Sequence, residues 1–113
     1  MAFEQTRIVG PVALGTSSAS PLYTVPSATT TIVKELILAS IAASSATNTV
    51  NIWLVPSGQS VADQYKIADA WSITGKETII VDFSLVMSVG DRIFATADTG
   101  SVVNITVSGI EEV

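Results

Sequence analysis

The chain has 113 residues and no cysteine, so we expect a single domain without a disulfide framework or a thiolate metal site. It also has no histidine, which removes the commonest general base and the commonest metal ligand at once. Ten acidic residues against five scattered basic ones give a net charge of −5, which disfavours binding to the phosphate backbone of nucleic acids.

Charged side chains are unusually sparse. They make up 13% of the chain, against about a quarter in an average soluble domain, while hydrophobic residues make up 48%. The apolar runs are short, and none approaches the roughly 20 residues of a membrane-spanning helix, so no membrane association is expected. The N-terminus lacks the basic region and apolar core of a signal peptide. Such a surface suits either a monomer coated with Ser and Thr or a subunit buried in an assembly, and we favour the assembly.

The first predicted strand, Thr6–Leu14, is interrupted by Gly10 and Pro11. Because proline cannot donate to a sheet ladder, this strand is expected at an edge or as a two-piece arm. An arm of this kind is a candidate for strand addition between subunits. We therefore divide the single domain into an N-terminal arm or edge strand over residues 1–14 and a β-sandwich over residues 15–113.

Two long strands are predicted within Thr29–Pro56, after a short strand at Leu22–Val25. The small residues Ala43–Ala46 form the turn between the two long strands. The second of them alternates with a period of two, which is typical of a half-buried strand. Its two faces are Val50, Ile52 and Leu54 on one side and Asn51 and Trp53 on the other.

The first of the two long strands is apolar on both faces. The residues that we assign to one face are Val33, Ile37, Ala39 and Ile41, and those assigned to the other are Ile32, Leu36 and Leu38. A strand in a two-layer sandwich normally has one wet face. The second apolar face is therefore expected to lie under a loop or the N-terminal arm, or to meet a neighbouring subunit.

The C-terminal half continues with short strands between turn residues. Residues 57–64 form a polar connection, Tyr65–Ile73 fits either a helix or a strand, and a short helical turn fits residues 61–68. Three further strands are predicted at Thr78–Val86, Arg92–Ala97 and Val102–Ile110. About eight short strands at regular spacing indicate an all-β fold, an antiparallel β-sandwich of jelly-roll type.

The acidic residues form no recognisable catalytic pair. Asp63 with Asp69, or Asp82 with Asp91, would have to meet in space for acid–base chemistry, and their spacing does not favour it. Asp91 follows Gly90 in a turn, where a carboxylate bonds backbone N–H groups. The serines lack a G-x-S-x-G elbow and a histidine base. The sequence therefore predicts no enzyme activity, no cofactor and no metal site.

Aromatic residues are the more informative group. Trp53, Trp71 and Tyr65 could stack on a sugar or anchor an interface. Core packing is the commoner role for such residues in a small sandwich, and we favour it for both tryptophans. If one of them is exposed, we expect Trp53, because the other face of its strand already supplies the core.

An ordered series of short segments spans residues 20–110. Its members are Leu22–Ser27, Thr30–Leu38, Val50–Gly58, Ile73–Thr78, Leu85–Met87 leading to Gly90–Ile93, and Val103–Gly109. This series resembles a widespread type of small structural protein of tailed bacteriophages. The resemblance implies a β-sandwich virion component on the capsid shell or on the tail, without catalytic residues. The first twenty residues lie outside the series.

The resemblance and the low charge together favour a capsid decoration (cement) protein. Such a protein would bind the shell of the major capsid protein as a homo-oligomer, with a trimer as the expected form, and would stabilise the shell. It would be assembled in the host cytoplasm and lie on the capsid surface of the virion. The expected interface residues are Arg7, Ile8, Val9, Pro11, Leu36, Leu38, Trp53 and Trp71.

Two alternatives remain open. The first is a tail or head-fibre component of the same kind of particle. The second is a carbohydrate-binding β-sandwich in which Trp53, Trp71 and Tyr65 would form the sugar platform.

Overall fold

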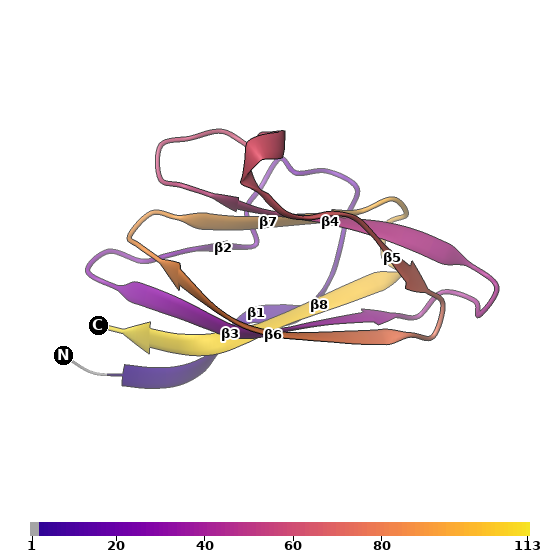
Figure 1. Cartoon of the computed structure of the whole chain (residues 1–113), viewed down its shortest axis with the longest axis horizontal. Helices are drawn as coiled ribbons and strands as arrows, with labels where there is room; N and C mark the ends of the chain where they lie inside the picture. Colours follow the sequence, from indigo (N-terminus) through magenta and orange to yellow (C-terminus); the bar gives the residue numbers. More distant parts are fainter. Residues whose placement is uncertain (1–2) are drawn as a thin grey trace.

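Eight strands form two facing four-stranded sheets (Figure 1). The computed structural model of the protein describes residues 3–113, with side chains at all of these positions except 3, 4, 6 and 83. The strands are β1 (Phe3–Ala13), β2 (Tyr23–Thr24), β3 (Thr30–Ser40), β4 (Thr47–Val55), β5 (Lys66–Thr74), β6 (Thr78–Met87), β7 (Arg92–Ala97) and β8 (Val103–Glu112). A short 3₁₀ turn, η1 (Asp63–Tyr65), precedes β5. The predicted antiparallel β-sandwich of about eight strands is confirmed, and residues 1 and 2 of the expected arm lie outside the described residues.

The strand order is that of a jelly roll. One sheet, sheet A, has the order β1-β8-β3-β6, and the other, sheet B, has the order β2-β7-β4-β5. The first strand pairs with the eighth, the second with the seventh, the third with the sixth and the fourth with the fifth, all antiparallel. This nested pairing of the first strand with the last, the second with the next to last and so on is the pairing of a jelly roll, which consists of two Greek keys. The consecutive strands β3 and β4 therefore lie in opposite sheets, so the turn predicted between them crosses from one layer to the other.

A register shift at Lys34 decides which side of β3 faces the core. The pairing of β3 with both of its neighbours slips between Val33 and Glu35. Before the shift in the chain Val33 points into the core, and after the shift Leu36 and Leu38 point into the core. Because the side-chain period of a strand is two, one irregular residue exchanges the faces. The predicted grouping of Val33 with Ile37 on one face was therefore wrong.

The core between the sheets is aliphatic. Its largest enclosed side chains come from both layers and from the connection after β1: Leu14, Leu38, Ile52, Ile73, Met87 and Ile105. Burying a side chain of this size contributes roughly 1.5–3 kcal/mol. In β8 the regular alternation predicted for Val103, Ile105 and Val107 is observed, with all three side chains fully buried.

β1 is an edge strand of sheet A, and its free side is interrupted at Gly10 and Pro11. Gly10 has a φ of 67°, which side chains disfavour, and a Cβ there would meet the carbonyl oxygen of Ile105. Pro11 is exposed, follows a cis peptide bond and has no N–H to offer to another strand. The register with β8 also shifts on both sides of Val9. β1 is therefore an edge strand that pairs with β8 on one side and is poorly suited to pairing with another strand on its free side.

Candidate interaction surface

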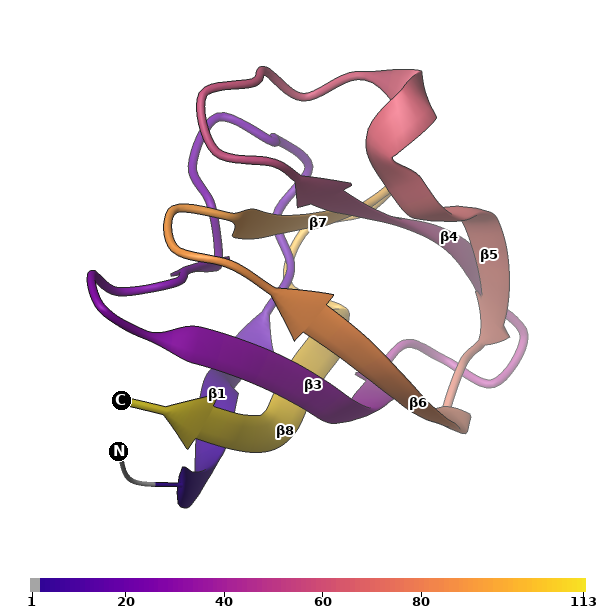
Figure 2. The same cartoon turned by 60° about the vertical axis from the view of Figure 1, so that its left-hand side comes forward.

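The outer face of sheet B carries a second, smaller apolar cluster. Trp53 and Phe94 are cross-strand neighbours there, next to Val55, and Trp53 is only 8% exposed. The loop between β4 and β5, which includes η1, lies over them and contributes Val61 and Tyr65 (Figure 2). Aromatic cross-strand pairs of this kind stabilise a sheet when they are shielded from water. The packed role that we favoured for Trp53 is confirmed, but Trp53 packs on the outer face of sheet B under the loop and not between the two sheets.

Several polar contacts hold this loop in place. The Asp91 carboxylate accepts hydrogen bonds from the backbone N–H of Ser57 at 3.1 Å and of Ser88 at 2.9 Å. The Arg92 guanidinium donates to the Gln59 carbonyl oxygen and lies 5.5 Å from the centre of the Phe94 ring. The turn role predicted for Asp91 is confirmed by its contact with Ser88. Its contact with Ser57 ties the β6–β7 turn to the loop.

Lys66 completes the cover at the start of β5. Its ammonium group lies 5.7 Å from the centre of the Trp53 ring and donates to Asp69 at 2.8 Å. This hydrogen bond, which the Asp69 carboxylate accepts, raises the pKa of Lys66. Cations over aromatic faces are attracted by the ring quadrupole, so the two basic residues here also shield the rings.

The outer face of sheet A is different, because its apolar side chains are exposed. Two rows of register partners cross this face, and each ends at an isoleucine or valine of β6: Ile110–Ile32–Val86 and Thr106–Ile37–Ile80. Ile80 is 60% exposed and Val86 is 63% exposed. In Figure 1 the described segments outside the two layers lie above sheet B, and the opposite side of sheet A is open.

A polar row separates the two apolar rows. It runs across the sheet through the register partners Arg7, Ser108, Glu35 and Asp82. Glu35 and Asp82 therefore lie side by side, and like charges directly opposite each other destabilise a sheet. Lys34, at the register shift, donates to the Ser84 hydroxyl at 3.0 Å. Among the described side chains, the ion pairs within 4.0 Å are those of Lys66 with Asp63 and Asp69. Lys34 therefore forms no ion pair with a described side chain that would offset the repulsion between the Glu35 and Asp82 carboxylates.

β6 forms the free edge of sheet A on the side away from β1 (Figure 2). It has 10 residues without proline, glycine or lysine, the usual devices that protect an edge strand. The other edges are less suited to pairing. β2 has two residues, and β5 is bent by two register shifts at a site where Ala70 has a φ of 51°. β6 is therefore the long described edge whose described side chains alternate throughout, and its pairing with β3 shifts once, between Leu85 and Asp82.

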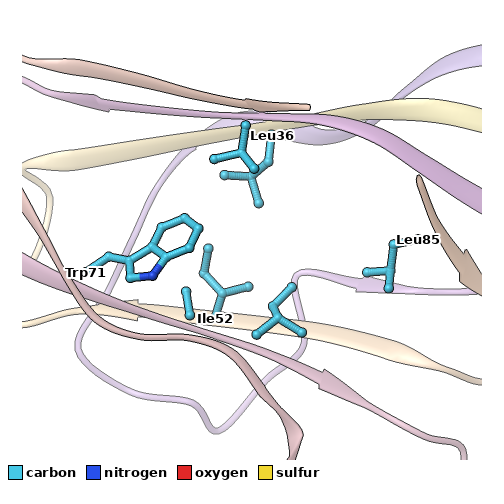
Figure 3. A pocket seen from close by; sticks show the side chains of 7 residues that line it. Leu36, Ile52, Trp71 and Leu85 are labelled. Atoms are coloured by element: carbon cyan, nitrogen blue, oxygen red, sulfur yellow. The ribbon is translucent and has the colours of Figure 1, made fainter. Parts of the chain in front are cut away.

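An apolar cavity of about 260 Å³ opens between β5 and β6, where the two sheets end. Leu36 and Ile52 reach it from opposite sheets, and Trp71 and Leu85 lie on opposite sides of it (Figure 3). The other lining residues are Ile67, Ala68 and Val81. All of these side chains are hydrocarbon except for the indole of Trp71. Such a lining can accept an apolar group but offers few partners to the hydroxyl groups of a sugar.

Tyr23 joins the two sheets at the side where β2 ends sheet B. Its hydroxyl donates to the Glu111 carboxylate at 2.7 Å and is 2.7 Å from the Thr31 hydroxyl, so β2 is tied to β8 and β3. Burial, followed by the hydrogen bond and charge of Glu111, raises the pKa of Tyr23 to about 12, and the Thr31 contact partly opposes the rise. This contact fixes the sandwich on the side opposite the cavity.

The structure does not bring the expected interface residues together. Arg7, Ile8 and Pro11 lie on β1, with Arg7 and Pro11 exposed, and Trp71 lines the cavity at the other edge. The remaining expected residues have little or no exposed surface and cannot make an interface: Val9, Leu36, Leu38 and Trp53.

Sequence reasoning missed Ile80 and Val86. A signal was present, because Ile80 and Val86 stand on the strand face that otherwise holds Thr78, Asp82 and Ser84. Two apolar residues on a polar face did not by themselves indicate that the strand stands at a free sheet edge.

Within residues 3–113, no group of three or more acidic side chains is placed to hold a metal ion. No helix in that range has the length and apolar character needed to cross a membrane. The described chain is a jelly-roll β-sandwich with one covered and one open outer face. No family model, curated protein or solved structure matches it.

Proposed function

We propose that this protein is a non-enzymatic structural subunit of a tailed-phage virion, a capsid decoration protein that binds copies of itself and the major capsid protein shell. The observation that carries the proposal is the open apolar face of sheet A, with Ile80 and Val86 more than half exposed. Exposed apolar patches of this kind mark sites of protein–protein contact.

The two outer faces supply the supporting argument. On sheet B the chain covers Trp53, Val55 and Phe94 with a loop of its own. On sheet A it leaves two apolar rows open, and both rows end at the free edge strand β6. A fold that can cover one such face and leaves the other open is suited to having the second face covered by another protein.

The fold and the sequence agree with this role without deciding it. Jelly rolls occur in viral capsid proteins and also in lectins, so the fold alone does not fix the function. The resemblance of residues 20–110 to small phage structural proteins points to the virion. The chain lacks histidine and cysteine, the side chains most often used as bases and nucleophiles.

A face with exposed apolar rows can stabilise a shell through weak contacts that are repeated many times. A subunit that binds only the assembled lattice shifts the equilibrium toward that lattice by mass action. Linking several such contacts in a homo-oligomer raises the effective concentration of each, so strong binding does not require a large single interface.

Purified virions provide the decisive measurement. We expect the protein to be present at a copy number near that of the major capsid protein, measured by quantitative mass spectrometry. A few copies per particle would support the tail or head-fibre alternative. Absence from purified virions would overturn both.

A reconstitution tests the surface itself. Particles stripped of the protein should bind the wild-type chain again, and the Ile80→Ser/Val86→Ser double variant should bind at least about tenfold more weakly because its apolar rows are broken. Ser60→Ala, in the loop over sheet B, is the matched surface control and should bind like the wild type. Equal binding by all three proteins would show that sheet A is not the contact face.

The carbohydrate-binding alternative fits the described surface less well. Trp53 lies under the loop, and the cavity beside Trp71 is lined by hydrocarbon. Glycan binding that is lost in Trp71→Ala and kept in Ile80→Ser would nevertheless favour this alternative.

A further inference from the structure

We propose that β6 pairs with β6 of a second copy, antiparallel and about a two-fold axis at position 83. This contact joins the two copies of sheet A into one continuous sheet of eight strands. It rests on the part of the proposed function in which the protein binds copies of itself, and it names the strand edge and the register of that contact.

The choice of edge follows from the four edges of the sandwich. β6 is long, has no proline or glycine and shifts its register once, between Leu85 and Asp82, whereas β1 carries Pro11, β2 has two residues and β5 is bent at Ala70. An unprotected edge offers a row of unpaired N–H and C=O groups to a strand of the same kind. Strand addition at such an edge is a recognised mode of association.

The register follows from the side chains on the outer face of β6. Residues directly opposite each other in an antiparallel pair share a face, so outward residues at even positions must meet outward residues at even positions. An axis at position 83 places Ile80 opposite Val86 of the second copy, and Asp82 opposite its Ser84. An axis at position 82 would place two Asp82 carboxylates face to face, and an axis at position 84 would place Asp82 opposite Val86.

Charge complementarity selects the same register. Within one chain Asp82 lies beside Glu35, and Lys34 contacts the edge strand through Ser84. Pairing about position 83 brings the Lys34–Ser84 pair of one copy to Asp82 of the other, and symmetry makes this contact twice. Each lysine then lies next to the carboxylates that have no cation partner among the described side chains of their own chain.

The apolar rows also become continuous across this contact. The row that ends at Val86 in one copy meets the row that ends at Ile80 in the other, and the reverse holds on the far side of the axis. Ile80 and Val86, at 60% and 63% exposure, would then contact each other side by side, and the outer face of the joined sheet would stay open to the shell.

The symmetry of the contact has a consequence for assembly. The same edge is used on both copies, so the interface is isologous and closes as a dimer. A trimer, which the resemblance led us to expect, cannot be built from this contact alone. One strand edge is a small interface, so we expect the dimer to dissociate on dilution.

Charge reversal with mixing tests the proposal. Lys34→Glu alone and Asp82→Lys alone each place two like-charged pairs at the axis, and each variant should dimerise roughly tenfold or more weakly than the wild type. An equimolar mixture of the two variants restores an opposite charge at both contacts. Sedimentation equilibrium should therefore show a mixed dimer about as tight as the wild-type dimer, and circular dichroism should show that both variants are folded.

A cross-link provides a second measurement that does not depend on charge. The chain has no cysteine, so Asp82→Cys mixed with Ser84→Cys offers one directly opposed thiol pair within disulfide range. We expect this mixture to form the mixed disulfide dimer on mild oxidation. Asp82→Cys mixed with Thr78→Cys, which the proposed register keeps apart, is the control and should form far less.

Three outcomes would overturn the inference: a wild-type chain that stays monomeric at high concentration, a mixture that does not recover dimerisation, or association that responds to Arg7→Glu and not to Lys34→Glu. The last would indicate head-to-tail pairing of β6 with β1. Virion copy number is an independent measurement, so a failed dimer with abundant protein in particles would reject the pairing and leave the capsid role standing.

Discussion

Both outer faces of this sandwich carry apolar side chains, but those on sheet B are covered and those on sheet A are exposed. On sheet B, Trp53 and Phe94 lie under a loop that Asp91 and Arg92 fasten to the body of the fold. On sheet A, apolar rows of similar character run out to the free strand β6 and remain exposed. Apolar surface costs free energy wherever water reaches it, so the difference separates residues that stabilise the monomer from residues available to a partner.

The covered face of sheet B is expected to contribute most to the stability of the monomer. Trp53→Ala should lower the free energy of unfolding by about 3–5 kcal/mol, because it removes a buried aromatic side chain and leaves a cavity under the loop. Urea denaturation followed by circular dichroism measures this change. Val86→Ala on the open face is the matched control and should change stability by less than about 0.5 kcal/mol in dilute protein. Similar losses in the two variants would remove the distinction between the faces.

The hydrogen bonds of Asp91 to the loop are expected to contribute less to stability than the buried aromatic residues do. Asp91→Ala removes a carboxylate that accepts two backbone hydrogen bonds, and we expect a loss of about 1–2 kcal/mol. Amide hydrogen exchange should also become faster in residues 56–65. Asp69→Ala, which breaks only the exposed pair with Lys66, should cost less than about 1 kcal/mol. Unchanged exchange in the loop of Asp91→Ala would show that the apolar cluster alone holds it.

The Tyr23 contact is common to both sheets and predicts a pH dependence. Its folded pKa, raised from 10.0 to about 12, favours the protonated phenol. The stabilisation is therefore complete below pH 10 and is lost as the pH rises through about 12. Absorbance of the phenolate should show a late step that disappears in Tyr23→Phe. A wild-type titration without that step would contradict the hydrogen bond to Glu111.

The open face should show the smallest change in monomer stability. Ile80→Ser and Val86→Ser each replace a side chain that is already mostly in water, so dilute protein should unfold within about 0.5 kcal/mol of the wild type. Light scattering at high concentration should nevertheless show weaker association. A large loss of stability in the dilute variants would mean that these residues support the monomer after all.

Much of the fold could be predicted from local alternation. The strand alternation in Thr78–Val86 and Val102–Ile110 identified β6 and β8, and Val50 and Ile52 were assigned to the core correctly. The exposed apolar residues of sheet A were missed, and Leu36 and Leu38 were placed on the outside, because they belong to a strand that is apolar on both sides. A period of two cannot tell the inner face of such a strand from the outer one.

The sequence by itself determined that this chain forms short strands, where most of them lie and which turns separate them, because these properties depend on neighbours a few residues apart. Only the tertiary structure decided that β3 and β4 join different sheets and that the shift at Lys34 exchanges the faces of β3. It also decided that the loop covers Trp53 and that Ile80 and Val86 stand at an open edge. Strand pairing and loop packing join residues distant in the sequence, so their outcome is set by the competition among all segments for the same core.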